Sequence, residues 1–126
     1  MARSVLIVDD EQHIRLLIEQ TLEELLDEGV ELYTASDGDD ALAAIDAQRP
    51  ELVFLDVMMP KRSGLDVCRA VRGELGLADT YIVLLTAKGQ ATDREEGLAA
   101  GANQYLTKPF DPDELLALAR TVLGAA

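Results

Sequence analysis

The chain has a single cysteine, Cys68, among its 126 residues. One cysteine excludes an intrachain disulfide and leaves no cysteine pair for a structural zinc site, which favours a reducing compartment. No apolar run approaches the roughly 20 residues that a membrane-spanning helix needs. Residues 1–4 lead directly into a short apolar run and do not resemble a signal peptide. We therefore expect a cytoplasmic protein with no membrane partner.

Basic residues are also scarce, since 11 Lys and Arg stand against 24 Asp and Glu, for a net charge of −13. A surface this acidic repels phosphate backbones, so we expect no direct binding to nucleic acid. The length fits one domain, residues 1–126, which is large enough to bury a core of its own. The chain stops soon after its last predicted helix, so we expect no output domain. Whether it is a natural single-domain protein or a piece of a longer one stays open.

Short apolar runs alternate five times with helical patterns. The runs 4–8, 52–55 and 81–85 are apolar almost throughout, which is typical of strands buried on both faces of a parallel sheet. The runs 30–35 and 103–107 mix polar and apolar residues and fit the two edges of that sheet. The sequence therefore predicts an α/β fold, a doubly wound five-stranded parallel sheet with strand order 2-1-3-4-5.

The predicted helices differ in how strongly they are anchored. The first has six apolar residues at three-and-four spacing, which predicts one amphipathic helix of about four turns that ends at Gly29. These residues are Ile14, Leu17, Ile18, Leu22, Leu25 and Leu26. The last helix begins with Asp111 as its cap and Pro112 at its first position. The pattern over 90–101 has only Leu98 as a large apolar residue, so we expect a weakly anchored helix there.

Polar side chains stand where the predicted strands end. Asp9 and Asp10 follow the first strand, Asp56 ends the third, and Thr86 and Lys108 end the fourth and fifth. The carboxyl ends of parallel strands share one edge, and the first and third strands are predicted neighbours, so three carboxylates should lie close together. Each residue alone has a structural explanation, as a helix cap, a β-branched strand residue or a solvated tip. Together, the five favour a functional site.

Crowded carboxylates need a cation. Two of them about 4 Å apart repel by roughly 4 kcal/mol at an intermediate dielectric constant. An all-oxygen cluster without His or Cys suits Mg²⁺. Lys108 and the Thr86 hydroxyl remain as donors for oxygens from outside the protein. A carboxylate nucleophile, Mg²⁺, an ammonium and a hydroxyl are what phosphoryl transfer onto Asp56 requires, and no strand end offers a His or Glu to activate water, so the acyl phosphate should persist.

These residues resemble the receiver domain of two-component response regulators, and the resemblance extends over residues 5–123. The segments that carry it are 8–11, 55–60 followed by Gly64, 85–87 and 101–110. Each segment alone is a moderate signal, but their order and spacing together are specific. The resemblance implies the flavodoxin-like (βα)5 form of the predicted fold.

The resemblance also implies a role for each acidic residue. Asp56 would accept a phosphoryl group from the phosphohistidine of a sensor histidine kinase or of a histidine phosphotransfer protein. Asp10 and Asp56 would bind Mg²⁺ directly, and Asp9 would assist through water. The backbone carbonyl of Met58 would complete the protein ligands. Beyond Mg²⁺-dependent self-phosphorylation and slow self-dephosphorylation, such a protein is not an enzyme.

Three further residues would transmit the signal if the resemblance holds. Lys108 would pair with the phosphate, Thr86 would bond to it, and Tyr105 would change position with it. The surface formed by the helix over 90–101, the strand over 103–107 and the last helix would then signal to a downstream protein partner, which the sequence does not identify.

Two other functions would share parts of this pattern. A haloacid-dehalogenase-type phosphatase also uses an aspartate nucleophile at a strand end, but it needs a second acid two residues later, where this chain has Met58. A flavin carrier with the same sheet order would need hydroxyls and glycines after the first strand. Residues 9–11 are all acidic there and would repel a phosphate group.

Overall fold

The computed structural model describes residues 3–87 and 92–124. Within these ranges the chain forms five strands: β1 (Ser4–Val8), β2 (Glu31–Ala35), β3 (Leu52–Asp56), β4 (Tyr81–Ala87) and β5 (Gln104–Lys108). All neighbouring strands pair in parallel, and their order in the sheet is β2-β1-β3-β4-β5. The predicted sheet and its strand order are confirmed.

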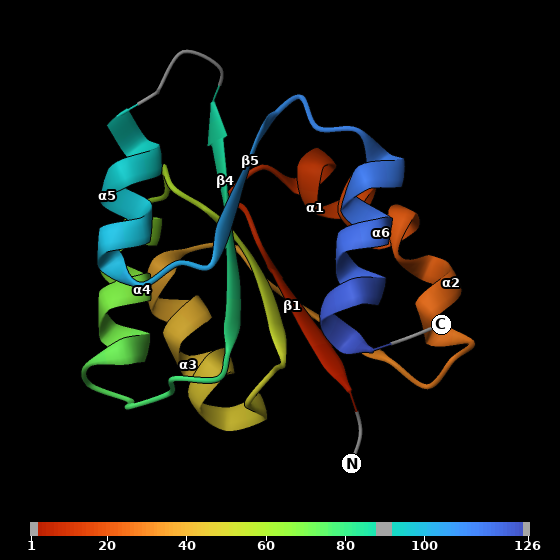
Figure 1. The fold of residues 1–126 in the computed structure, drawn as a ribbon, viewed down its shortest axis with the longest axis horizontal. Helices are drawn as coiled ribbons and strands as arrows, with labels where there is room; N and C mark the ends of the chain where they lie inside the picture. Colours follow the sequence, from red (N-terminus) through yellow and green to blue (C-terminus); the bar gives the residue numbers. More distant parts are fainter. Residues whose placement is uncertain (1–2, 88–91, 125–126) are drawn as a thin grey trace.

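The described residues form six helices on the two faces of this sheet. They are α1 (Gln12–Thr21), α2 (Glu23–Leu26), α3 (Gly38–Gln48), α4 (Gly64–Arg72), α5 (Thr92–Ala100) and α6 (Pro112–Leu123). Figure 1 shows α3, α4 and α5 on one face, and α1, α2 and α6 on the other. None of these helices is long and apolar enough to cross a bilayer. The fold is therefore doubly wound, as predicted.

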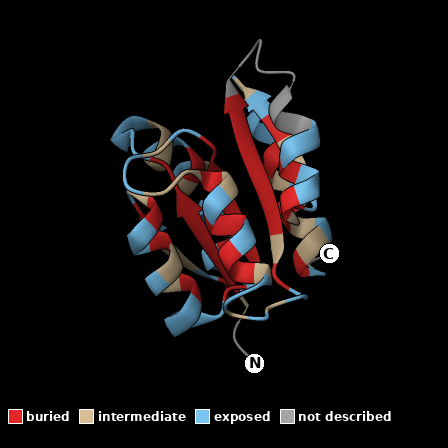
Figure 2. Cartoon of the chain, turned by 90° about the vertical axis from the view of Figure 1, so that its left-hand side faces the viewer, coloured by how far each residue is buried: buried red, intermediate tan, exposed pale blue. Residues whose placement is uncertain are grey.

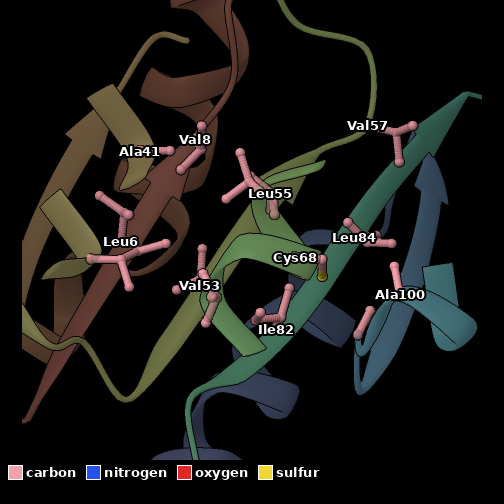
Figure 3. Close-up of a cluster of buried hydrophobic side chains, with 14 of the residues drawn as sticks. Leu6, Val8, Ala41, Val53, Leu55, Val57, Cys68, Ile82, Leu84 and Ala100 are labelled. Carbon is pink, nitrogen blue, oxygen red and sulfur yellow. The ribbon is translucent and has the colours of Figure 1, made fainter. Parts of the chain in front are cut away.

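The core divides into two clusters because the sheet is covered on both faces. Val53 and Leu55 of β3 point into the cluster under α3 and α4, which also contains the buried Cys68 (Figure 3). Leu52 and Phe54 alternate with them and point into the cluster under α1 and α6. Strands β1 and β3 are buried along their whole length, while β2 and β5 have exposed residues, as expected for edges (Figure 2).

The first predicted helix is interrupted, so the prediction of one continuous helix is wrong. Leu22 separates α1 from α2, and its φ of −95° and ψ of 4° depart from helical values. Leu17 is exposed, and Leu26 is 49% exposed, so neither belongs to a buried stripe. The Thr21 hydroxyl donates to the Leu17 carbonyl oxygen at 2.7 Å. Back-bonding of this type often bends helices, and the break follows directly after Thr21.

The helix predicted over 90–101 is α5, and its first two predicted residues lie outside the described ranges. Leu98 is 48% exposed, so the one large apolar residue of this pattern is not part of the core. Gly97 and Ala100 are the buried residues among 95–100. A Cβ at Gly97 would overlap Cδ1 of Leu84, so α5 approaches β4 through small residues.

Arg72 joins three segments at the far end of α4. Its Nη1 donates to the Leu77 carbonyl at 2.7 Å, and its Nε donates to the Gly101 carbonyl at 3.0 Å. Its Nη2 donates to Asn103 Oδ1 at 2.8 Å, and the same oxygen accepts the Ile82 backbone N–H at 2.8 Å. The guanidinium thus ties the turn before β5 to the start of β4.

We predict that Arg72→Met lowers the free energy of unfolding by about 2 kcal/mol, since hydrogen bonds from a charged donor are lost and their acceptors remain. Arg69→Met is the matched control, because Arg69 pairs with Asp66 at 3.3 Å on an exposed face of the same helix. It removes the same charge and should cost no more than about 0.5 kcal/mol. Urea unfolding measures both variants, and equal losses would contradict the role given to Arg72.

Candidate functional site

The strand pairing brings the predicted site residues to one edge of the sheet. The parallel register of β1 and β3 places Asp9 beside Asp56 at their carboxyl ends. Asp56 pairs with Leu85 on β4, and Thr86 follows one residue later. Lys108 is the last residue of β5, two strands away from Asp56.

Three carboxylates form the centre of this edge. Asp9, Asp10 and Asp56 each offer an oxygen, and these oxygens lie within 4.8 Å of one another. Asp9 is completely buried and Asp56 is 5% exposed, whereas Asp10 is exposed. The cluster is therefore accessible to solvent on the side of Asp10.

Lys108 supplies positive charge to these carboxylates. Its Nζ lies 2.8 Å from Asp9 Oδ2 and 3.4 Å from Asp56 Oδ1. Burial lowers the pKa of Lys108, but the hydrogen bond to Asp9 and the charge of Asp56 outweigh it, so the pKa is raised overall. Lys108 therefore stays charged at neutral pH. The sequence did not indicate these ion pairs, because Lys108 comes from a distant strand.

The environment of Asp56 disfavours its ionised form. Burial, followed by the charge of Asp9, raises the pKa of Asp56 to about 6. Lys108 and the Met58 N–H, which lies 3.3 Å from Asp56 Oδ1, offset this only in part. Asp56 is therefore mostly ionised at pH 7, and it is a stronger base than an ordinary aspartate.

Besides Lys108, two further donors, from Glu11 and Arg15, hold Asp9 in place. The Glu11 N–H donates to Asp9 Oδ1 at 2.9 Å, so this carboxylate bonds to the start of the chain that leads into α1. The Arg15 Nη1 donates to the Asp9 carbonyl oxygen at 2.5 Å. Arg15 was not predicted as a site residue. Its only signal in the sequence is a cation one turn after Glu11, which many exposed helices also show.

The β3–α4 loop, residues 57–63, follows Asp56 and is held at its base. The Val57 N–H donates to the Leu85 carbonyl at 3.1 Å, and the Gly64 N–H donates to the Val57 carbonyl at 2.9 Å. A Cβ at Gly64 would lie 2.9 Å from Val57 Cα and would overlap the Asp56 carbonyl oxygen. Only glycine lets α4 begin this close to Asp56. The metal-ligand role of the Met58 carbonyl, within this loop, stays a prediction.

Thr86 and Tyr105 lie where the sequence placed them. Thr86 is buried near the end of β4. Tyr105 pairs with Leu84, is half-buried on β5, and packs against the cluster under α3 and α4. Their predicted response to a phosphoryl group on Asp56 stays a prediction.

Comparisons with known proteins agree with the site. The family model for the response regulator receiver domain matches residues 5–120. The chain is 40% identical over 123 residues to the alkaline phosphatase synthesis transcriptional regulatory protein PhoP of Bacillus subtilis (strain 168), covering 98% of this chain and 49% of that protein. The structure of the chemotaxis response regulator CheY4 of Vibrio cholerae is similar, with 37% identity, a TM-score of 0.84, and coverage of 98% of this chain and 100% of that one. The BeF3-activated DrrB receiver domain is also similar, with 32% identity, a TM-score of 0.85, and coverage of 98% and 99%.

The fold and the strand-end residues define a doubly wound α/β domain of the CheY type. The chain belongs to the response regulator receiver domain family, which serves two-component signalling, and the predicted resemblance is confirmed. It spans about half the length of the curated relatives it matches, which are named as transcriptional regulators.

We predict that metal-free Asp56→Asn is more stable than the wild type at pH 7.5, by up to about 3 kcal/mol for two pKa units. The pKa of Asp56 rises from 3.8 to about 6 in the folded state, so the folded state holds this proton more tightly than the unfolded state does. Ionisation therefore costs stability as the pH rises from about 4 to 6, and the full cost is present above pH 6. Urea unfolding with a chelator, at several pH values from about 4 to 7.5, should show that the stability gap between Asp56→Asn and the wild type grows as the pH rises. A gap that does not change with pH would contradict the raised pKa.

Proposed function

We propose that Asp56 accepts a phosphoryl group from the phosphohistidine of a sensor histidine kinase or of a histidine phosphotransfer protein. An ionised oxygen of Asp56 attacks phosphorus, the P–N bond to the imidazole breaks, and the imidazole leaves with that electron pair and is then protonated. The placement of a nearly buried Asp56 beside Asp9 and Lys108 supports this proposal most directly. Although the pKa of Asp56 is raised to about 6, Asp56 is still mostly ionised at neutral pH, as a nucleophile must be.

The donor set fits Mg²⁺. Three carboxylates within 4.8 Å offer only oxygen, which this ion prefers. Asp10 and Asp56 would bind it directly, Asp9 would assist through water, and the Met58 carbonyl would complete the protein ligands. When bound, Mg²⁺ neutralises negative charge on the transferred phosphoryl group. The open side at Asp10 gives both the ion and the phosphodonor access to Asp56.

Lys108 and Thr86 would hold the product. The Lys108 ammonium already lies within 3.4 Å of an Asp56 oxygen, so it can pair with a phosphoryl group on that carboxylate. The Thr86 hydroxyl would donate to a second phosphoryl oxygen. The protein would act as a phosphorylated signal, with self-phosphorylation and slow self-dephosphorylation as its only chemistry.

Acetyl phosphate, a small phosphodonor, tests the reaction. We expect the wild type to gain one phosphoryl group by mass spectrometry only with Mg²⁺, as an acyl phosphate that hydroxylamine removes. Asp56→Asn should not be labelled, and Asp10→Asn should bind Mg²⁺ more weakly because a ligand charge is lost. Asp66→Asn is the control, since it removes the same charge from an exposed ion pair on α4. Labelling of Asp56→Asn, or an unchanged Mg²⁺ titration in both site variants, would refute the assignment.

We further propose that phosphorylation is sensed on the face formed by α5, β5 and α6, where a downstream protein would bind. Movement of Thr86 toward the phosphoryl group would make space beside β5 for the ring of Tyr105. The buried residues of α5 among 95–100 are Gly97 and Ala100, so this helix can shift at little cost. Typical allosteric couplings are about 1 to 3 kcal/mol, so the unphosphorylated protein should already visit the active state.

Thr86→Ala tests this switch. Beryllofluoride, a phosphoryl mimic, should shift the amide NMR signals of the wild type in the β3–α4 loop and also in β5. In Thr86→Ala the loop should still respond, because Asp56 is intact, while the response of Tyr105 and its neighbours should be lost. An equal β5 response in both proteins would mean that Thr86 does not carry the signal.

A further inference from the structure

The first turn of α3 lies against Pro60 and Arg62 of the β3–α4 loop. The Gly38 N–H donates to the Pro60 carbonyl at 3.5 Å, and the Arg62 Nε donates to Asp39 Oδ1 at 2.9 Å. The loop therefore has a second support besides its base. This support comes from the segment after β2, which contributes no ligand to the proposed metal site.

Gly38 makes this contact sterically possible. A Cβ at Gly38 would lie 2.9 Å from the Arg62 carbonyl carbon, and it would overlap the Arg62 carbonyl oxygen and Cβ. The φ of Gly38 is not in the left-handed region, so the backbone conformation itself does not require glycine. The close approach of the loop does require it. The Asp37-Gly38 pair that begins α3 is thus explained by what packs on it.

The position of the loop matters because of Met58. Its side chain is 64% exposed and so adds little packing that could fix the backbone. The place of the Met58 carbonyl therefore depends on the anchors of the loop. These are its base at Val57, the Met58 N–H bond to Asp56, the packing of Met59 against the core, and the contact with α3.

We propose that Gly38 and Asp39 are positioning residues for the metal site. They fix the position of the β3–α4 loop and so hold the Met58 carbonyl beside Asp56. This inference rests on the proposed Mg²⁺ role of that carbonyl. Neither residue touches the ion or the phosphoryl group. They act through Pro60 and Arg62.

Gly38→Ala is the main test. Alanine favours a helix more than glycine does, so the change harms the loop contact and not α3 itself. We expect the Mg²⁺ dissociation constant to rise about tenfold, as for other supporting residues of metal sites. In the metal-free protein, the amide signals of 57–63 should move while those of β1 stay in place.

A charge-matched pair of variants gives a second test that does not depend on the alanine variant folding. Asp39→Asn removes the partner of Arg62, and Asp66→Asn removes the partner of Arg69 in a comparable exposed pair. Asp39→Asn should weaken Mg²⁺ binding by about threefold, in line with the strength of exposed pairs. Asp66→Asn should leave binding unchanged.

The outcomes separate this inference from the proposed function. If Gly38→Ala and Asp39→Asn bind Mg²⁺ as the wild type does, the inference is wrong, even if Gly38→Ala is less stable to urea. The proposed function would survive that result as long as Asp10→Asn and Asp56→Asn still lose Mg²⁺. If Mg²⁺ binding by the wild type does not depend on those two aspartates, the metal site itself is wrong. If the amide signals of 57–63 do not move in metal-free Gly38→Ala, that result alone would show that Gly38 does not position the loop.

Discussion

Repulsion among three carboxylates is the constraint on which the site depends. Two ionised carboxylates 4.8 Å apart repel by about 3.5 kcal/mol at an effective dielectric constant of 20. Asp9 is nevertheless completely buried, and the ion pair with Lys108 at 2.8 Å makes this tolerable. At Asp56, burial and then the charge of Asp9 outweigh Lys108, so the pKa of Asp56 is still raised to about 6. The site therefore keeps an excess of negative charge that favours the binding of a cation.

The sheet order and the site could be predicted for the same reason. Apolar runs assign three strands to the centre and mixed runs assign two to the edges, which agrees with the order β2-β1-β3-β4-β5. Parallel strands end on one edge, so Asp9 and Asp56 were expected to meet. The ion pairs of Lys108 could not be predicted, because they depend on how far a long side chain reaches across two strands. The bond from Arg15 to a backbone carbonyl could not be predicted either, because a cation one turn after Glu11 is a pattern that many exposed helices share.

The errors in the helices have a different physical cause. Hydrophobic periodicity weighs large side chains, and in α5 the only one it finds is Leu98, which is exposed. The helix instead packs through Gly97, at a distance from Leu84 that leaves no room for a Cβ. Gly38 and Gly64 mark close approaches of the same kind, against Arg62 and Asp56. Such contacts depend on the absence of a side chain, and hydropathy does not record an absence. The sequence therefore does not predict how the β3–α4 loop is supported.

Lys108 links the charge balance of the site to the proposed output face. A phosphoryl group carries about 1.5 to 2 negative charges at neutral pH, more than the single charge of the Asp56 carboxylate that it modifies. The Lys108 ammonium now divides its bonds between Asp9 and Asp56, so extra charge on Asp56 would draw it away from Asp9. Mg²⁺ would then be needed to balance the charge of Asp9. Because Lys108 ends β5, the strand that carries Tyr105, any redistribution of its bonds acts directly on that strand. If the proposed switch operates, the ion pairs of Lys108 would give β5 a second connection to Asp56 besides Thr86.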